Sequence, residues 1–406
     1  MKKVLFVLGG LHMGGVETYI VRLAKELNAC GCEVDVLIIS KQYDSGLISE
    51  ISKFTNIFIH ENASFLKASS WINAFLPLKW EGERACYDVV HVVDLLTLGF
   101  VFLNRNVIKF KALSIGIYHS MEMYWWRNKG AYFRSKLLEL YDSNVSLTLF
   151  PSESVAIMAS ELTGVAIDDM DILPLGIELS KYSNCAPSFS SRKIVSVGRL
   201  VDFKVYNRHL ISQLSELRKL AEFEYYIYGE GPELDALQKH AVECDVDRYV
   251  HFMGGVKYKD LPSVLDGIFC FVGSGTTIIE ASAAGVPSLV GIESIKQPLT
   301  CGLFSDVEGY SYNEESATTR RLSFVDAVNE IYQLNESEYA YLARCHRTKS
   351  SCFDIKITAV EFLKKSNKLP NFSFKFNRWL AILSFVYSVF RFGPRALKSR
   401  FESGKD

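Results

Sequence analysis

The sequence has almost no net charge and no long apolar run. Among its 406 residues, 45 lysines and arginines are balanced by 46 aspartates and glutamates, which leaves a formal charge of -1. Such a balance creates no global field that would attract nucleic acid, so any basic patch must be local. No segment approaches the roughly 20 apolar residues that a membrane-spanning helix needs. We therefore expect neither a nucleic-acid-binding protein nor an integral membrane protein.

The cysteines also lack the arrangement of a metal site. They are scattered, and they form no CxxC pair and no Cys/His cluster with zinc spacing. This usage fits a reducing cytoplasm. Residues 1–8 are basic and then apolar like the start of an export signal, but glycines interrupt the pattern and no small-residue cleavage site follows. We expect a cytoplasmic protein.

Short, continuous apolar runs alternate with helical patterns along most of the chain. Because buried parallel strands are apolar on both faces, these runs predict an α/β fold with doubly wound sheets. The length exceeds one ordinary core, so we expect two such domains. The predicted strands are residues 4–8, 34–39, 89–93, 113–118 and 147–150 in the first half, and residues 194–197, 225–228, 250–253, 268–271 and 288–290 in the second.

A change of composition separates the two halves. Residues 181–192 are rich in serine and lack apolar periodicity, which is typical of an interdomain linker. We predict Rossmann-like domains at residues 1–180 and 193–366. Residues 367–406 form an aromatic and basic tail, whose apolar part suits either a helix in a membrane interface or a helix packed back on the protein.

Two short motifs suggest anion binding without proving it. Gly9-Gly10 and Gly14-Gly15 lie between the first predicted strand and a helix, where backbone amides can approach an anion. The spacing is not GxGxxG, and many doubly wound domains turn this way without a ligand. Later, Arg199 and Lys204 follow a strand and could neutralise a departing diphosphate, although two surface cations would look the same.

The turn after residues 268–271 carries a stronger signal. It reads Gly-Ser-Gly-Thr-Thr at residues 273–277 and opens a helix of small and apolar residues. Its amides and hydroxyls suit an anion at a helix start. Glu280 lies about one turn into that helix, where its carboxylate could accept hydrogen bonds from ribose hydroxyls. No pair of carboxylates stands out as the acid and nucleophile of a glycosidase.

Six short motifs follow one another along the chain: Gly14-Gly15-Val16-Glu17, Tyr87-Asp88-Val89-Val90-His91, Pro174-Leu175-Gly176-Ile177-Glu178, Gly198-Arg199-Leu200 with Lys204, Gly229-Glu230-Gly231-Pro232, and Glu280-Ala281 before Gly285-Val286-Pro287. Taken together, they resemble the family 4 glycosyltransferases over most of the chain. The resemblance implies a GT-B fold, in which two Rossmann-like domains face each other across a cleft, and a retaining, metal-independent enzyme without a cofactor. The first domain would lie on the acceptor side and the second would bind the nucleotide sugar.

The resemblance also assigns roles to residues. Arg199, Lys204 and His119 are expected to be catalytic: the two cations hold the donor diphosphate, and His119 contacts the transferred sugar or orients the acceptor. Glu280 is expected to hold the ribose. The expected acceptor-side residues are His12, Gly14 and Glu17. The expected donor-binding residues are Gly15, Gly198, Gly229, Gly231, Gly273, Ser274, Gly275, Thr276, Thr277 and Glu280.

One position departs from the family pattern and keeps alternatives open. The family has two glutamates with seven residues between them, and Val272 stands where the first is expected. The departure removes a carboxylate near the donor sugar. A nucleotide-sugar epimerase of the same fold and a non-catalytic partner subunit with a degenerate donor site are the alternative interpretations.

The expected substrates are a nucleotide diphosphate sugar, with UDP preferred because it is common in the family, and a glycan or lipid-linked acceptor. Residues 121–127 are unusually aromatic. Together with the tail, they favour a lipid-linked acceptor, as in assembly of O-antigen or capsule-like bacterial surface polysaccharides, and peripheral contact with the inner face of the plasma membrane. Packing of these aromatic residues in the core is the alternative.

Overall fold

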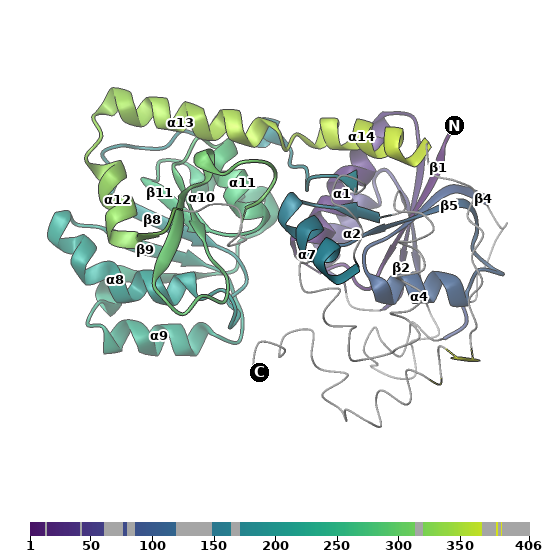
Figure 1. Ribbon diagram of the computed structural model, residues 1–406, viewed down its shortest axis with the longest axis horizontal. Coiled ribbons are helices and arrows are strands. Elements are labelled where there is room, and N and C mark those ends of the chain that lie inside the picture. The colour runs from purple at the N-terminus through teal and green to yellow at the C-terminus, as the bar shows by residue number, and fades with distance from the viewer. Residues whose placement is uncertain are drawn as a thin grey trace. The chain divides into compact units, whose positions relative to one another are not determined.

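The protein contains two compact units, each built around one seven-stranded sheet (Figure 1). Unit 1 comprises Met1–Gly176 and Ile355–Asp406, and unit 2 comprises Ile177–Asp354. The computed structural model describes residues 1–12, 14–40, 43–60, 76–78, 86–118, 148–163, 171–312, 320–367, 379–380 and 383.

Unit 1 has a parallel sheet with the strand order β3-β2-β1-β4-β5-β6-β7. Its interior strand β1 is buried from Val4 to Leu8, as the apolar run predicts. The strands are β1 (Lys3–Leu8), β2 (Glu33–Ile38), β3 (Asn56–Ile59), β4 (Cys86–Val92), β5 (Lys109–Gly116), β6 (Thr148–Phe150) and β7 (Asp171–Ile172); the helices are α1 (Gly15–Ala29), α2 (Ser45–Ile51), α4 (Leu95–Leu103), α7 (Glu153–Thr163) and α14 (Ile355–Asn367).

Unit 2 repeats this strand order as β10-β9-β8-β11-β12-β13-β14, but β13 and β14 are antiparallel to their neighbours. Helices α8 and α9 lie on one side of the sheet, and α11 and α13 lie on the other (Figure 1). The strands are β8 (Lys193–Val197), β9 (Glu224–Tyr228), β10 (Val250–Gly254), β11 (Cys270–Gly273), β12 (Ser288–Gly291), β13 (Leu299–Leu303) and β14 (Leu322–Ser323); the helices are α8 (Tyr206–Leu220), α9 (Leu234–Glu243), α10 (Leu261–Leu265), α11 (Thr276–Ala283), α12 (Phe324–Tyr332) and α13 (Glu336–Ser351).

The structure places the boundaries between the units differently from the sequence-based prediction. Residues 181–192, which were expected to form a linker, belong to unit 2. The amide of Ser188 donates to the carbonyl of Ile268, and the amide of Ala186 donates to Asp266. Helix α14, expected in the second domain, belongs to unit 1. The rings of Phe6 and Phe362 lie 5.9 Å apart, so α14 covers apolar surface of the first sheet.

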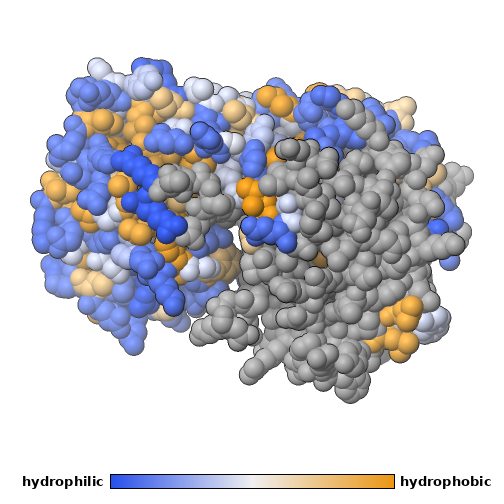
Figure 2. All heavy atoms as spheres, viewed as in Figure 1, coloured by the Kyte–Doolittle hydropathy of each residue, from blue (hydrophilic) through white to orange (hydrophobic). Residues whose placement is uncertain are grey.

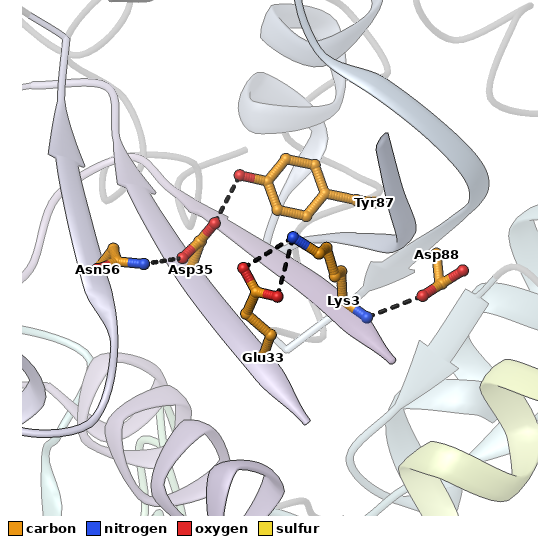
Figure 3. Close-up of polar contacts among 6 residues, drawn as sticks. All are labelled: Lys3, Glu33, Asp35, Asn56, Tyr87 and Asp88. Carbon is orange, nitrogen blue, oxygen red and sulfur yellow. Dashed lines mark hydrogen bonds and ion pairs between the residues drawn. The ribbon is translucent and has the colours of Figure 1, made fainter. Parts of the chain in front are cut away.

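At the amino ends of the unit 1 strands, polar side chains link neighbouring strands (Figure 3). The Lys3 ammonium pairs with Glu33 at 2.9 Å, and the Lys3 amide donates to Asp88 at 2.8 Å. The buried Asp35 carboxylate accepts hydrogen bonds from the Tyr87 hydroxyl at 2.7 Å and from the Asn56 amide at 2.9 Å. These contacts join β1, β2, β3 and β4.

In the described part of the chain, no helix is long and apolar enough to cross a membrane. The described tail residues Trp379, Leu380 and Leu383 are helical and exposed. The rest of the predicted tail helix lies outside the described residues.

Candidate functional site

The carboxyl ends of β8, β11 and β12 bring together most of the predicted donor-binding residues. These parallel strands are neighbours in the unit 2 sheet, so the loops that follow them meet at one edge. The chain also reverses its direction of travel across the sheet here, because β9 and β10 lie beyond β8 on the side away from β11. Ligands of open α/β sheets bind at the carboxyl ends of strands beside such a switch point.

The loop after β8 carries both predicted cations. Arg199 is exposed and Lys204 is half-buried. The Lys204 Nζ atom lies against Gly198, since a Cβ atom added at Gly198 would lie 3.3 Å from it. The missing side chain at Gly198 therefore gives the ammonium its place at the end of the strand.

Lys204 keeps its positive charge in this position. Burial lowers the pKa of the Lys204 ammonium, but attraction to Tyr206 and Glu293 outweighs burial and raises the pKa above its ordinary value. Among the residues that the structure describes, no carboxylate forms an ion pair with Lys204. A charged ammonium without an ion-pair partner is suited to an anionic ligand.

Gly229 and Gly231 allow two backbone segments to approach each other. A Cβ atom at Gly229 would lie 1.9 Å from the carbonyl oxygen of Gly198, and one at Gly231 would lie 2.0 Å from that of Leu200. Two hydrogen bonds accompany this approach: the amide of Gly198 donates to Tyr228, and the amide of Leu200 donates to Glu230. These glycines therefore shape the loop after β8, a role distinct from contact with a donor.

The predicted phosphate turn joins β11 to α11. Gly275, with a φ of 70°, is the N-cap of α11, and no side-chain hydrogen bond caps this helix end. The amides of the first turn therefore remain available to an anion. The Thr277 hydroxyl donates to the carbonyl of Val197 at 3.0 Å, which ties the helix start to the end of β8. The turn and the two cations thus share one edge.

The two positions of the family's glutamate pair differ sharply in their surroundings. Glu280 lies in α11 and is 2% exposed. Val272, where the family has its first glutamate, lies inside β11 in the hydrophobic core, and its carbonyl accepts a hydrogen bond from Ser196 at 2.6 Å. A carboxylate at position 272 would be buried in apolar surroundings, where an unpaired charge is costly.

Glu293, which the sequence analysis did not single out, contributes a carboxylate at the same edge. It follows β12, and its Oε1 atom accepts a hydrogen bond of 2.7 Å from the Ser274 hydroxyl. The position of β12 beside β11 is what places Glu293 here. The signal that could have found it is its place just after a predicted strand, at the same edge as the glycine-rich turn.

The predicted acceptor-side residues form a separate set in unit 1. Gly14 is the N-cap of α1, and a Cβ atom at Gly14 would overlap the Glu17 carboxylate, whose Oε2 atom would lie 2.4 Å away. His12 is exposed, and so is Gly15, which was predicted to bind the donor but lies in unit 1. This loop follows β1, which lies beside β4 where the strand order of unit 1 reverses. It occupies in unit 1 the topological place that the loop after β8 occupies in unit 2.

His119 and the aromatic residues 121–127 lie outside the described residues. The neighbouring Tyr118 is described, and its hydroxyl lies 2.7 Å from Nε2 of His91. His91 is fully buried in β4, and its Nδ1 atom lies 2.9 Å from the Ser114 hydroxyl. Burial lowers the pKa of His91 to about 3, so the ring is neutral at pH 7 and acts as a core hydrogen-bonding group.

Unit 2 also has an open, mainly apolar groove of about 520 Å³ away from the predicted site. Leu303, Ile331 and Leu342 are among its lining residues, which come from β13, α12 and α13. On the face drawn in Figure 2, hydrophilic residues cover much of unit 2 and apolar residues interrupt them in patches. Within the described residues, no group of histidine, cysteine, aspartate and glutamate side chains could hold a metal ion.

Comparison with known families gives two matches in chain order. The model described as Glycosyltransferase Family 4 matches residues 13–181, and the model described as Glycosyl transferases group 1 matches residues 188–294. A GDP-mannose-dependent alpha-(1-6)-phosphatidylinositol monomannoside mannosyltransferase of Mycobacterium tuberculosis is 29% identical over 181 residues, which are 39% of this chain and 46% of the relative. The match thus spans about half the length of this curated relative.

Solved structures share the fold over nearly the whole chain. A glycosyltransferase from Rickettsia africae has a TM-score of 0.62 and 14% identity, with 90% of this chain and 98% of the other covered. An Anabaena protein in complex with UDP and glucose has a TM-score of 0.62 and 13% identity, with coverage of 91% and 100%. The fold is that of the GT-B glycosyltransferases, and the chain belongs to the family 4-type glycosyltransferases.

Proposed function

We propose that the protein is a retaining glycosyltransferase that moves a sugar from a nucleotide diphosphate donor to a glycan or lipid-linked acceptor. The observation that carries the proposal is the edge formed by β8 and β11. There Lys204, which is charged and has no ion-pair partner among the described residues, Arg199 and the uncapped start of α11 follow adjacent strands. A diphosphate is the anion that fits two cations and a row of amides.

In the proposed reaction, the bond between the sugar's anomeric carbon and the diphosphate oxygen breaks, and negative charge grows on the leaving group. Lys204 and Arg199 would stabilise that charge, and positioned groups of this kind typically contribute about 2.7–4 kcal/mol each. The acceptor hydroxyl attacks the same face of the sugar and gives its proton to the departing diphosphate. His119 would contact the transferred sugar or orient the acceptor, and Glu280 would hold the ribose. This route needs neither a metal nor a protein base.

Calorimetry with UDP and GDP tests the proposal directly. We expect the intact protein to bind one of them without added metal, with UDP as our first choice and GDP included because the mycobacterial relative is named for GDP-mannose. Binding of neither nucleotide would contradict the proposal and favour the non-catalytic partner subunit. A product formed from the donor sugar alone, without acceptor, would favour the epimerase.

We further propose a lipid-linked acceptor of bacterial surface-polysaccharide assembly and a cytoplasmic protein in peripheral contact with the membrane. Trp379, Leu380 and Leu383 support this part, since all three apolar side chains are exposed in one short stretch. Co-sedimentation with vesicles that contain anionic lipid should recover the protein, whereas a variant with these three residues changed to serine should stay in the supernatant. Equal recovery of both proteins would contradict the membrane contact.

A further inference from the structure

Glu293 lies directly after β12 at the edge where the proposed diphosphate site forms. It is half-buried, and its Oε1 atom accepts a hydrogen bond of 2.7 Å from Ser274, which is 1% exposed. Ser274 belongs to the turn between β11 and α11. The carboxylate is therefore fixed to the turn by a buried hydroxyl.

The backbone on both sides of Glu293 is also held in place. The amide of Ser294 donates to the carbonyl of Phe203 at 2.8 Å, which joins the loop after β12 to the loop that carries Lys204. Ser294 has a φ of 61°, an uncommon conformation for a residue with a side chain. A Cβ atom at Gly291 would lie 2.5 Å from the Tyr206 ring, so the strand end packs closely on α8. The side chain of Glu293 thus comes from a segment whose backbone is hydrogen-bonded to the loop after β8 and closely packed on α8.

One oxygen of the Glu293 carboxylate can accept further hydrogen bonds. Ser274 donates to Oε1, and in the described part of the chain Oε2 takes part in no hydrogen bond or ion pair. An ionised carboxylate accepts about four hydrogen bonds. Lys204 attracts Glu293 through space but does not form an ion pair with it. The structure therefore leaves an acceptor open beside the cations.

The charge of Glu293 decides which part of a donor it could contact. A carboxylate repels a phosphate, so it does not suit the diphosphate, which belongs at Arg199 and Lys204. Sugar hydroxyls, in contrast, donate hydrogen bonds, and a charged acceptor binds them more strongly than a neutral one. The edge thus combines cations after β8 with an acceptor after β12.

We propose that Glu293 is a specificity-determining residue that accepts a hydrogen bond from a hydroxyl group of the transferred sugar. The inference rests on the proposed function. The Glu293 carboxylate enters the site from β12, whereas position 272 in β11 is occupied by a core valine. Glu293 selects neutral, hydroxyl-bearing sugars and disfavours sugars that carry a carboxylate, such as uronic acids.

The experiment separates the sugar from the nucleotide. Calorimetry measures the Kd of UDP, UDP-glucose and UDP-glucuronate, and of GDP and GDP-mannose, for the wild type, Glu293→Gln and Glu216→Gln. The last variant makes the same change at an exposed residue of α8 and serves as control. We expect Glu293→Gln to raise the Kd of the neutral nucleotide sugar about 10-fold or more, the loss typical of a hydrogen bond to a charged group. The Kd of the free nucleoside diphosphate should not change.

The outcomes distinguish the two proposals. If the wild type binds no nucleotide, the proposed function fails. Suppose that the wild type does bind the nucleotide. If Glu293→Gln then weakens binding of the nucleotide sugar and of the free nucleoside diphosphate equally, or weakens the binding of neither, only the role of Glu293 is overturned. A wild type that binds UDP-glucuronate as tightly as UDP-glucose also overturns it, and this measurement does not depend on any variant. The thermal midpoint of Glu293→Gln confirms that the variant folds.

Discussion

The amino-end edge of the unit 1 sheet and the carboxyl-end edge of the unit 2 sheet both carry charged side chains, but their partners differ. At the first edge, the carboxylates of Glu33, Asp35 and Asp88 all have partners on neighbouring strands (Figure 3). At the second edge, Lys204 lacks an ion pair within the described residues, and Oε2 of Glu293 accepts nothing there.

This difference follows from how the two edges are built. Strand starts in unit 1 are joined side by side, so their charges compensate one another and strengthen the sheet. Strand ends in unit 2 continue into loops that pack closely at glycines. Within the described residues, Lys204 has no ion pair there and Oε2 of Glu293 accepts no hydrogen bond. A network with all partners present stabilises the fold, whereas a network with partners missing is suited to a ligand.

The largest expected effect is on turnover, and it comes from a change at the carboxyl-end edge of the unit 2 sheet. Lys204→Ala should lower kcat/KM by about 100-fold or more, because it removes one of the charges that stabilise the leaving diphosphate. The midpoint of thermal unfolding should change little, since Lys204 forms no ion pair with the residues that the structure describes. The assay is transfer from the donor identified by calorimetry.

The matched control for this variant is Lys239→Ala, which removes an exposed lysine of α9. It should leave kcat/KM unchanged. A Lys204→Ala enzyme with the turnover of the wild type would show that this edge does not bind the diphosphate.

A change at the amino-end edge of the unit 1 sheet should instead lower stability and leave nucleotide binding unchanged. Tyr87→Phe removes the hydroxyl that donates to the buried Asp35, and hydrogen bonds to charged groups contribute about 1.5–3 kcal/mol. We therefore expect a loss of about 2 kcal/mol in the free energy of unfolding of unit 1, measured in urea, with no change in the Kd of the nucleoside diphosphate. Tyr341→Phe, which changes an exposed tyrosine, serves as control. If Tyr87→Phe weakened nucleotide binding and left the stability unchanged, the two edges would not differ in function as we propose.

The sequence predicted the repeating elements of both sheets better than it predicted their limits. Buried strands such as β1 and β8 are continuous apolar runs, so hydrophobic patterning found them. The two-residue strands β7 and β14 are too brief for such a pattern, and Thr300 and Gly302 interrupt the apolar run of β13. The return of α14 to unit 1 depends on contacts such as Phe6 with Phe362 that no local pattern contains. The same reason explains Glu293: only the adjacency of β11 and β12 brings it to Ser274.

His346 extends the comparison to the amino-end edge of unit 2. It is fully buried in α13, and its Nε2 atom accepts a hydrogen bond of 2.9 Å from the amide of Ser288 at the start of β12. Burial lowers the pKa of His346 below the value of about 6.5 that a histidine has in an unfolded chain. Protonation would also remove the acceptor for Ser288.

The sign of the resulting pH dependence follows from this lowered pKa. Above about pH 6.5 the His346 ring is neutral in the folded and the unfolded state, and its contribution to stability is fully present. Below that pH, the unfolded chain binds a proton at His346 that the folded chain does not bind. Unit 2 should therefore lose up to about 1.4 kcal/mol of unfolding free energy per pH unit on acidification from this residue. His346→Gln keeps an acceptor that does not titrate, so urea unfolding between pH 7 and pH 5 should show a shallower pH dependence for this variant. If the free energy of unfolding depends equally steeply on pH in both proteins, His346 does not contribute to the pH dependence of the stability of unit 2.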